Sequence, residues 1–121
     1  RAGARAGDES VRRGLEALMD LVPELESDLR GLDRDLKGLV SRASKLAPVK
    51  DRVIWLPNIF TAVRDNLRHI RQQALIRSEN FRRAGLAFEL SRFEREIERL
   101  EAAAQKCLDS SVALKAAVEG A

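Results

Sequence analysis

Cysteine, tyrosine, glycine and proline are scarce or absent in this sequence, and their scarcity excludes several classes of protein. Cys107 is the single cysteine, so neither an internal disulfide nor a thiolate cluster for zinc can form. A lone thiol favours a reducing, intracellular compartment. The chain has no tyrosine, seven glycines, three prolines and only 4% aromatic residues. A β-sandwich is therefore not expected, because it needs β-branched and aromatic residues and frequent turns.

Long apolar runs and chemical motifs are also missing. No run reaches the roughly 18 apolar residues of a membrane-spanning helix, so the sequence predicts no membrane span. There is no glycine-rich phosphate loop and no serine elbow. The single histidine has no glutamate three residues before it, as a di-iron bundle requires. We therefore expect no metal and no cofactor, and an enzyme is less expected than a binding protein.

The residues that are abundant indicate long helices. Of the 121 residues, 45% are hydrophobic and 34% are charged, which is typical of long or coiled helices. We predict an all-α fold: an elongated antiparallel helical bundle or coiled-coil hairpin with about three long helices. Residues 8–121 would form a single domain, and residues 1–7 a flexible tail. The Arg-Ala-Gly-rich opening looks like a fragment boundary, a tag scar or a processed leader.

The first helix is predicted from Asp8 to Leu46 by a heptad repeat. Its apolar positions advance in alternating steps of four and three, which is the pattern of a coiled-coil seam: Val11, Leu15, Leu18, Val22, Leu25, Leu29, Leu32, Leu36, Leu39, Ala43 and Leu46. Pro23 must kink or break this helix, and the unbroken phase favours a kink. A strict seam is narrow for a globular core, so self-association or a helical partner would complete the packing.

Two further helices are expected after a loop at 47–50. Pro57 suits the first turn of a helix that runs to about Arg77. A third helix follows Leu86 and stops near Gly120, with a second strict heptad: Leu86, Leu90, Phe93, Ile97, Leu100, Ala104, Cys107, Ser111, Leu114 and Val118. Between them, residues 78–80 form either a turn or a stutter within one long helix, and a slip of the heptad phase favours the turn.

Two segments are candidate partner-binding sites. The run 53–60 is the densest apolar stretch and contains the only tryptophan, so Trp55, Leu56, Ile59 and Phe60 form either a cap on the bundle or an interface anchor. Residues 47–83 carry eight basic and three acidic groups. Within this segment a stripe of arginines lies at helical spacing: Arg64, Arg68 and Arg71. We interpret the stripe either as a face that pairs with the acidic third helix or as a site for an acidic partner or RNA.

One short motif resembles the signature of a known family. The segment Arg64-Asp65-Asn66-Leu67-Arg68-His69 has the R-x4-H pattern with an acidic residue after the arginine. It is similar to the signature of the HEPN family of helical nucleases, which cut RNA without metal, usually at a dimer interface. The resemblance implies that Arg64 stabilises the phosphate charge and that His69 transfers a proton.

We predict a non-catalytic helical module for protein–protein interaction or assembly: an adaptor, an oligomerisation arm or a subunit of a larger complex. Its partners would be itself or other helical proteins. The HEPN-like ribonuclease is one alternative. The other is a sensory helical bundle of a receptor, which would place both chain ends on the same side of the molecule.

Overall fold

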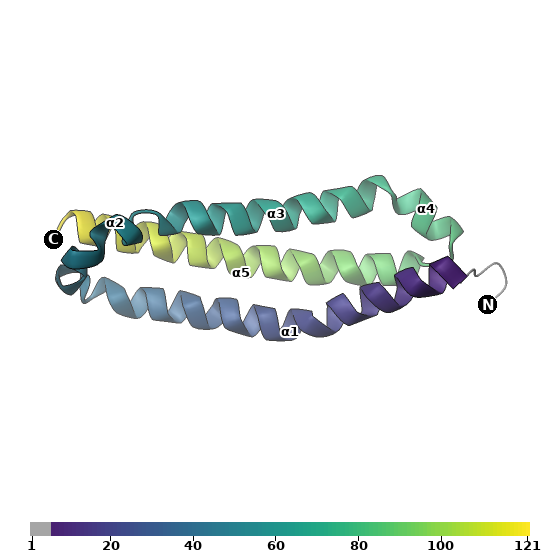
Figure 1. Cartoon of the computed structure of the whole chain (residues 1–121), viewed down its shortest axis with the longest axis horizontal. Coiled ribbons are helices and arrows are strands. Elements are labelled where there is room, and N and C mark those ends of the chain that lie inside the picture. Colours follow the sequence, from purple (N-terminus) through teal and green to yellow (C-terminus); the bar gives the residue numbers. More distant parts are fainter. Residues whose placement is uncertain (1–5) are drawn as a thin grey trace.

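The described part of the chain is all-α, as predicted. The computed structural model describes residues 6–121, and within that range the chain forms helices and no strand. Three long helices lie side by side: α1 (Ala6–Val40), α3 (Leu56–Ile76) and α5 (Ala87–Glu119) (Figure 1). Of the tail predicted at 1–7, residues 1–5 lie outside the described range, and α1 begins directly after them.

Helix α1 continues through Pro23 without a break. A helix with an internal proline lacks one backbone hydrogen bond, and it bends because the proline ring clashes with the preceding turn. In Figure 1 the purple first part of α1 is inclined to the blue second part. Of the two alternatives at this proline, the continuous helix is the one observed.

The first helix ends earlier than its heptad pattern predicted. The α-helix stops at Val40, and residues Ala43–Val49 form a 3-10 helix, η1, followed by the short α2 (Lys50–Val53). The hydroxyl of Ser41 donates a hydrogen bond of 3.1 Å to the carbonyl of Gly38. Such a bond from a side chain to a backbone carbonyl competes with the backbone hydrogen bonds that would continue the helix. Pro57 lies in the first turn of α3, as predicted.

The second reversal is a turn and not a stutter. Helix α3 ends at Ile76, the short α4 (Ser78–Arg83) follows, and Gly85 adopts a φ of 75° before α5 begins. A positive φ is accessible to glycine at little cost because it has no Cβ. The N–H of Leu86 donates to the carbonyl of Phe81 at 2.8 Å, which ends α4 in the manner of a helix C-cap.

Helix α5 is the central element of the fold. It packs against both α1 and α3, and in Figure 1 it lies between them. Every position of its predicted heptad is at most 6% exposed, so this seam is confirmed. The buried face of α5 is wider than the seam because two helices cover it. It also includes Glu89, Ala103, Leu108 and Ser110.

Candidate interaction surface

Helix α1 meets α5 through a row of residues that differs from the predicted seam. We call it the inner row; its members are buried or half-buried at heptad spacing: Leu15, Met19, Val22, Glu26, Leu29, Asp33 and Leu36. Only every second position of the predicted seam belongs to it. Met19 and Val22 pack with Phe93, Ile97 and Leu100 of α5 in one core cluster.

Four of the other positions of the predicted seam are half exposed, whereas Leu39 and Leu46 pack against the core. Val11, Leu18, Leu25 and Leu32, each seven residues apart, are 45%, 52%, 47% and 46% exposed, and Leu21 beside them is 51% exposed. These five residues are the outer row. With Gly14 and Asp28 in the intervening positions, their steps again alternate three and four. Helix α1 therefore carries two adjacent heptad faces, and only the inner one is covered.

Polar contacts between α1 and α5 hold α1 in this rotation. Glu26, 6% exposed, accepts a hydrogen bond of 2.8 Å from Arg99 of α5. Asp33 accepts one from the hydroxyl of Ser110. If α1 turned so that the outer row faced α5, both carboxylates would lose these partners, which is costly for a buried charge.

The contact with Ser110 also changes the acidity of Asp33. The hydrogen bond from the Ser110 hydroxyl, together with nearby Lys37, lowers the pKa of Asp33 below its ordinary value, against the opposing effect of burial. Hydrogen bonds to a carboxylate favour its charged form. The ionised Asp33 is thus part of the contact between α1 and α5.

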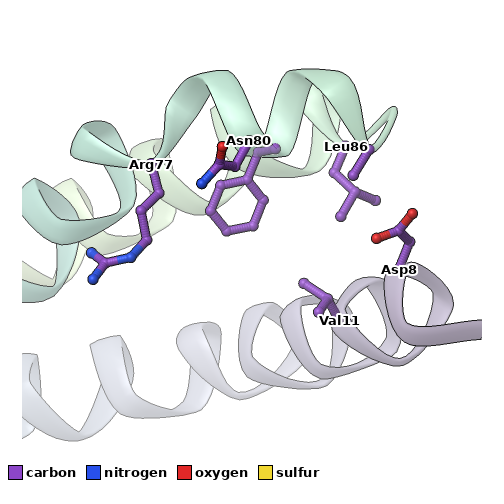
Figure 2. A pocket seen from close by; sticks show the side chains of 7 residues that line it. Asp8, Val11, Arg77, Asn80 and Leu86 are labelled. Atoms are coloured by element: carbon purple, nitrogen blue, oxygen red, sulfur yellow. The ribbon is translucent and has the colours of Figure 1, made fainter. Parts of the chain in front are cut away.

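The outer row begins at an open pocket near the N-terminal end of α1. The pocket has a volume of about 220 Å³, and its lining is mainly apolar, with Val11, Phe81 and Leu86 among the lining residues. Figure 2 shows Val11 and Asp8 rising from α1 toward Asn80 and Leu86. Val11, the first residue of the outer row, therefore lies across this pocket from Phe81 of α4 and from Leu86.

Four exposed carboxylates of α1, spaced four residues apart, wind from the side opposite the outer row at Glu16 to a position within that row at Asp28. Glu16, Asp20, Glu24 and Asp28 are exposed, and none has an ion pair or hydrogen bond with any residue between 6 and 121. Their spacing of four places them as neighbours on the helix surface, where like charges destabilise the helix by about 0.2–0.5 kcal/mol per pair. These carboxylates therefore weaken α1 in the isolated chain.

The apolar run around Trp55 is divided between surface and core. Trp55 and Ile59 are 60% and 53% exposed. Phe60 is buried in the core, and Leu56 is half-buried against the same cluster. Of the four residues predicted at this site, two are therefore available to a partner in the isolated chain, and the other two close the end of the bundle.

The arginine stripe of α3 largely faces α5. Arg71 donates hydrogen bonds of 2.8 and 3.3 Å to Glu101, and these bonds raise the pKa of Arg71 above its ordinary value. Arg64 donates to Gln105 at 2.9 Å and also pairs with Asp65. Arg68 lies 3.7 Å from Glu101 and is about half exposed. This is the pairing with the acidic third helix that the charge distribution suggested.

Arg64 and His69 do not converge in the monomer. Both lie on α3, which runs without interruption from Leu56 to Ile76. Five residues apart on one helix, their side chains leave the axis about 140° from each other. Arg64 is directed to α5, whereas His69 is exposed. The pair therefore does not form one site within a single chain.

Three further observations concern metal binding, membranes and the thiol of Cys107. Over residues 6–121 no group of three or more His, Cys, Asp or Glu side chains is placed to hold a metal ion. In the same range no helix is both long and apolar enough to cross a membrane. Cys107 is fully buried with its Sγ 3.0 Å from the Leu29 carbonyl, and burial raises the pKa of its thiol.

No family model, curated protein or solved structure matches this chain.

Sequence reasoning missed the outer row because it treated all apolar heptad positions as one seam. A signal was present: Arg12, Met19, Glu26 and Asp33 repeat every seven residues and form a mixed polar row next to the apolar one. Charged residues repeated at that spacing are normally read as a solvated face. Here Arg12 pairs with Glu89 of α5, Glu26 with Arg99 and Asp33 with Ser110.

Proposed function

We propose that this chain is a non-catalytic helical module for protein–protein interaction or assembly, and that the outer row of α1 is its main contact surface. The observation that carries the proposal is the half exposure of five apolar residues at heptad spacing on one helix, Val11, Leu18, Leu21, Leu25 and Leu32. Heptad faces pack against other helices in coiled-coil fashion. The uncovered face supports an interaction in which another helix lies along α1.

The free energy that would be gained by burying the outer row supports its role in binding a partner helix. Fully burying a leucine contributes about 1.5–3 kcal/mol, so covering the exposed half of each leucine contributes roughly 1 kcal/mol. Single apolar residues scattered on a surface are ordinary, whereas several apolar residues aligned on one face are typical of an interaction site. The row extends over 22 residues, from Val11 to Leu32, which is about 31 Å of helix.

Trp55 and Ile59 form a second candidate contact site, at the N-terminal end of α3. Tryptophan is frequent among the residues that dominate binding energy in interfaces. Both residues lie at the start of α3, which is near the C-terminal end of α5 (Figure 1), so one helix lying on the outer row need not reach them. They accordingly form a site for a separate contact, in keeping with an adaptor or a subunit of a larger complex.

The proposal is tested with a synthetic helix that has leucine at its own seam and uncharged glutamine and alanine on its flanks. We expect this peptide to bind the whole chain, as measured by fluorescence anisotropy. The double variant Leu18→Gln, Leu25→Gln should weaken binding at least tenfold, because it removes apolar area from the row. The control Val112→Gln changes a residue of α5 that is 50% exposed and should bind as the parent chain does.

Helix content measured by circular dichroism should be the same in the parent chain and both variants, since Leu18, Leu25 and Val112 are 52%, 47% and 50% exposed. Light scattering gives the mass of the chain alone. A monomer that binds no seam helix would contradict the proposed function, and so would binding that survives the double variant unchanged.

A further inference from the structure

We infer that the outer row binds the outer row of a second copy of this chain, so that two α1 helices pack antiparallel about a two-fold axis close to Leu21. This inference rests on the proposed function and names the partner. It follows from the near symmetry of the row and from the positions of two charged residues, Arg13 and Asp28, beside and within it.

The outer row is open to a second helix because α1 is covered on one side only. In the part of the chain that the structure describes, α1 packs extensively on α5 and makes no extensive contact with α3. The apolar members of the row remain 45–52% exposed. A second α1 lying on this row would give α1 two helical neighbours, as α5 already has.

The apolar side chains of the row follow nearly the same order in both chain directions. Leu18 and Leu25 lie three and four residues from Leu21, and Val11 and Leu32 lie ten and eleven residues from it. A two-fold axis just beyond Leu21 therefore sets Leu18 level with Leu25 of the second copy, and Val11 level with its Leu32. A two-fold interface needs one patch that is complementary to itself, and this row meets that need.

Asp28 favours the antiparallel direction over the parallel one. It is exposed and pairs with no residue between 6 and 121. Two parallel α1 helices in register would bring both Asp28 carboxylates together, and like charges across an interface cost binding free energy. The antiparallel arrangement instead sets Asp28 about 1.5 Å in height from Gly14 of the second copy. Glycine has no side chain, so it leaves room for the carboxylate.

Arg13 supplies the opposite charge for Asp28. It is exposed and has no ion pair or hydrogen bond with any residue of the range 6–121. Arg13 and Asp28 both lie on the side of the row that is turned away from α5, about 60° apart around the helix axis. In the antiparallel pair these sides meet, and Arg13 lies about 3 Å in height from Asp28 of the second copy. The two-fold axis gives two such charge pairs.

The other carboxylates near the row lie at its rim. Glu24 and Asp20 leave the helix about 80° and 120° from the centre of the row, on the side turned away from α5. Both are exposed, so solvent screens their repulsion across the pair. Their repulsion therefore weakens the dimer slightly and does not exclude it.

The size of the contact predicts a reversible dimer. A strip one helix wide, about 10–12 Å, along the roughly 31 Å of the row covers about 300–400 Å² of each copy. An interface of standard size buries about 800 Å² per partner. We therefore expect a dissociation constant in the micromolar range, since only a small surplus remains after the cost of association.

The first test measures the mass of the whole chain by sedimentation equilibrium from low micromolar to millimolar concentration. The mass should rise from one chain to two. The variant Leu18→Gln, Leu25→Gln should weaken the dimer at least tenfold, because it removes two apolar layers from the contact. The control Val112→Gln, on α5, should dimerise as the parent chain does.

Charge exchange tests the pairing of Arg13 with Asp28. Arg13→Glu and Asp28→Arg should each weaken the dimer about three- to tenfold, because each replaces an attraction by a repulsion. The double variant Arg13→Glu, Asp28→Arg exchanges the two charges and should restore the dimer. Restoration distinguishes a direct contact between copies from damage to the fold of either single variant.

A spin label at the exposed Arg34 tests the direction of the helices. The label is attached in Arg34→Cys, since Cys107 is buried and does not compete for it. In the antiparallel dimer the two labels lie about 40 Å apart, because position 34 is level with position 9 of the second copy. In a parallel dimer in register they would lie about half as far apart.

The outcomes separate this inference from the proposed function. A chain that stays monomeric at millimolar concentration but binds the leucine-seam peptide would overturn the dimer and leave the interaction module standing. A dimer that survives Leu18→Gln, Leu25→Gln, fails to recover on charge exchange, or gives the short label distance would also overturn the inferred arrangement. A monomer that binds no seam helix would sink both.

Discussion

At the scale of single residues, a few polar side chains decide how α1 sits on α5. Glu26 is nearly buried and is bonded to Arg99 of α5 and to Arg30 of its own helix at 2.8 and 2.7 Å. Removing one partner of a buried ion pair is usually strongly destabilising, because the other charge is left without compensation. Such contacts fix orientation more than they add net stability.

Asp33 gives this orientation a pH dependence. Because its pKa in the folded protein is lowered, the ionised side chain stabilises the fold above the ordinary value of 3.8, and this contribution is lost as the pH falls through the folded value. We expect Asp33→Asn to lower the free energy of unfolding at pH 7 by about 1–2 kcal/mol. The difference from the parent chain should shrink in acid.

Denaturant titrations between pH 7 and pH 2 would measure this effect. The matched control is Asp35→Asn, since Asp35 is exposed and has no partner among the residues of the structure. Its stability should stay close to that of the parent chain over the whole range. An equal loss in both variants would show that the contact with Ser110 has no specific role.

At the scale of elements, glycines have opposite roles in the helices and in the turn. Gly85 has a φ of 75° at the reversal between α4 and α5. Gly14, Gly31 and Gly38 lie within α1, and a Cβ added at any of them would have no neighbour within 4 Å. The described part of the chain brings no helix that close.

Alanine substitutions should therefore change stability in opposite directions. Gly85→Ala forces a Cβ into the left-handed region and should cost about 1–2 kcal/mol. Gly31→Ala should stabilise α1 by about 0.5–1 kcal/mol, because alanine loses less backbone entropy in a helix and the site has room. Thermal or denaturant unfolding followed by circular dichroism gives both values. A stabilising Gly85→Ala would contradict the backbone argument.

At the scale of the whole molecule, stability is concentrated in α5. Helix α5 is covered on two sides, and its seam residues Ala104, Cys107, Ser111 and Leu114 are fully buried. Helix α4 buries none of its residues, and α1 leaves its outer row uncovered. Regions with few buried contacts open at lower free energy than the core does. The proposed interaction surface thus lies on a less constrained helix that packs on a rigid one.

Hydrogen exchange should reproduce this gradient. We expect amides of α4 to exchange fastest, those of α1 next, and those in the middle of α5 only through global unfolding. Mass spectrometry of peptic fragments or NMR would resolve the three classes. Binding of the leucine-seam peptide should slow exchange in α1 between Val11 and Leu32 and leave α4 little changed. Uniform protection along the chain would contradict the gradient.

The sequence by itself determined the helices and most of the core. Its low glycine and proline content and its two heptad repeats predicted an all-α chain, the start of α3 at Pro57 and every buried position of the α5 seam. These features are local: periodicity assigns residues to one face of a helix, and proline and glycine act on the backbone where they stand.

Only the tertiary structure decided which part of the apolar face of α1 is covered. A heptad repeat places Leu18, Val22 and Leu25 on one face of the helix. The rotation of α1 about its own axis decides which of these residues contact α5, and it depends on partners far away in the chain. Arg99 and Ser110 lie more than seventy residues from Glu26 and Asp33. Their contacts turn the inner row toward α5 and leave the leucines of the outer row exposed, because a buried carboxylate must keep its partner.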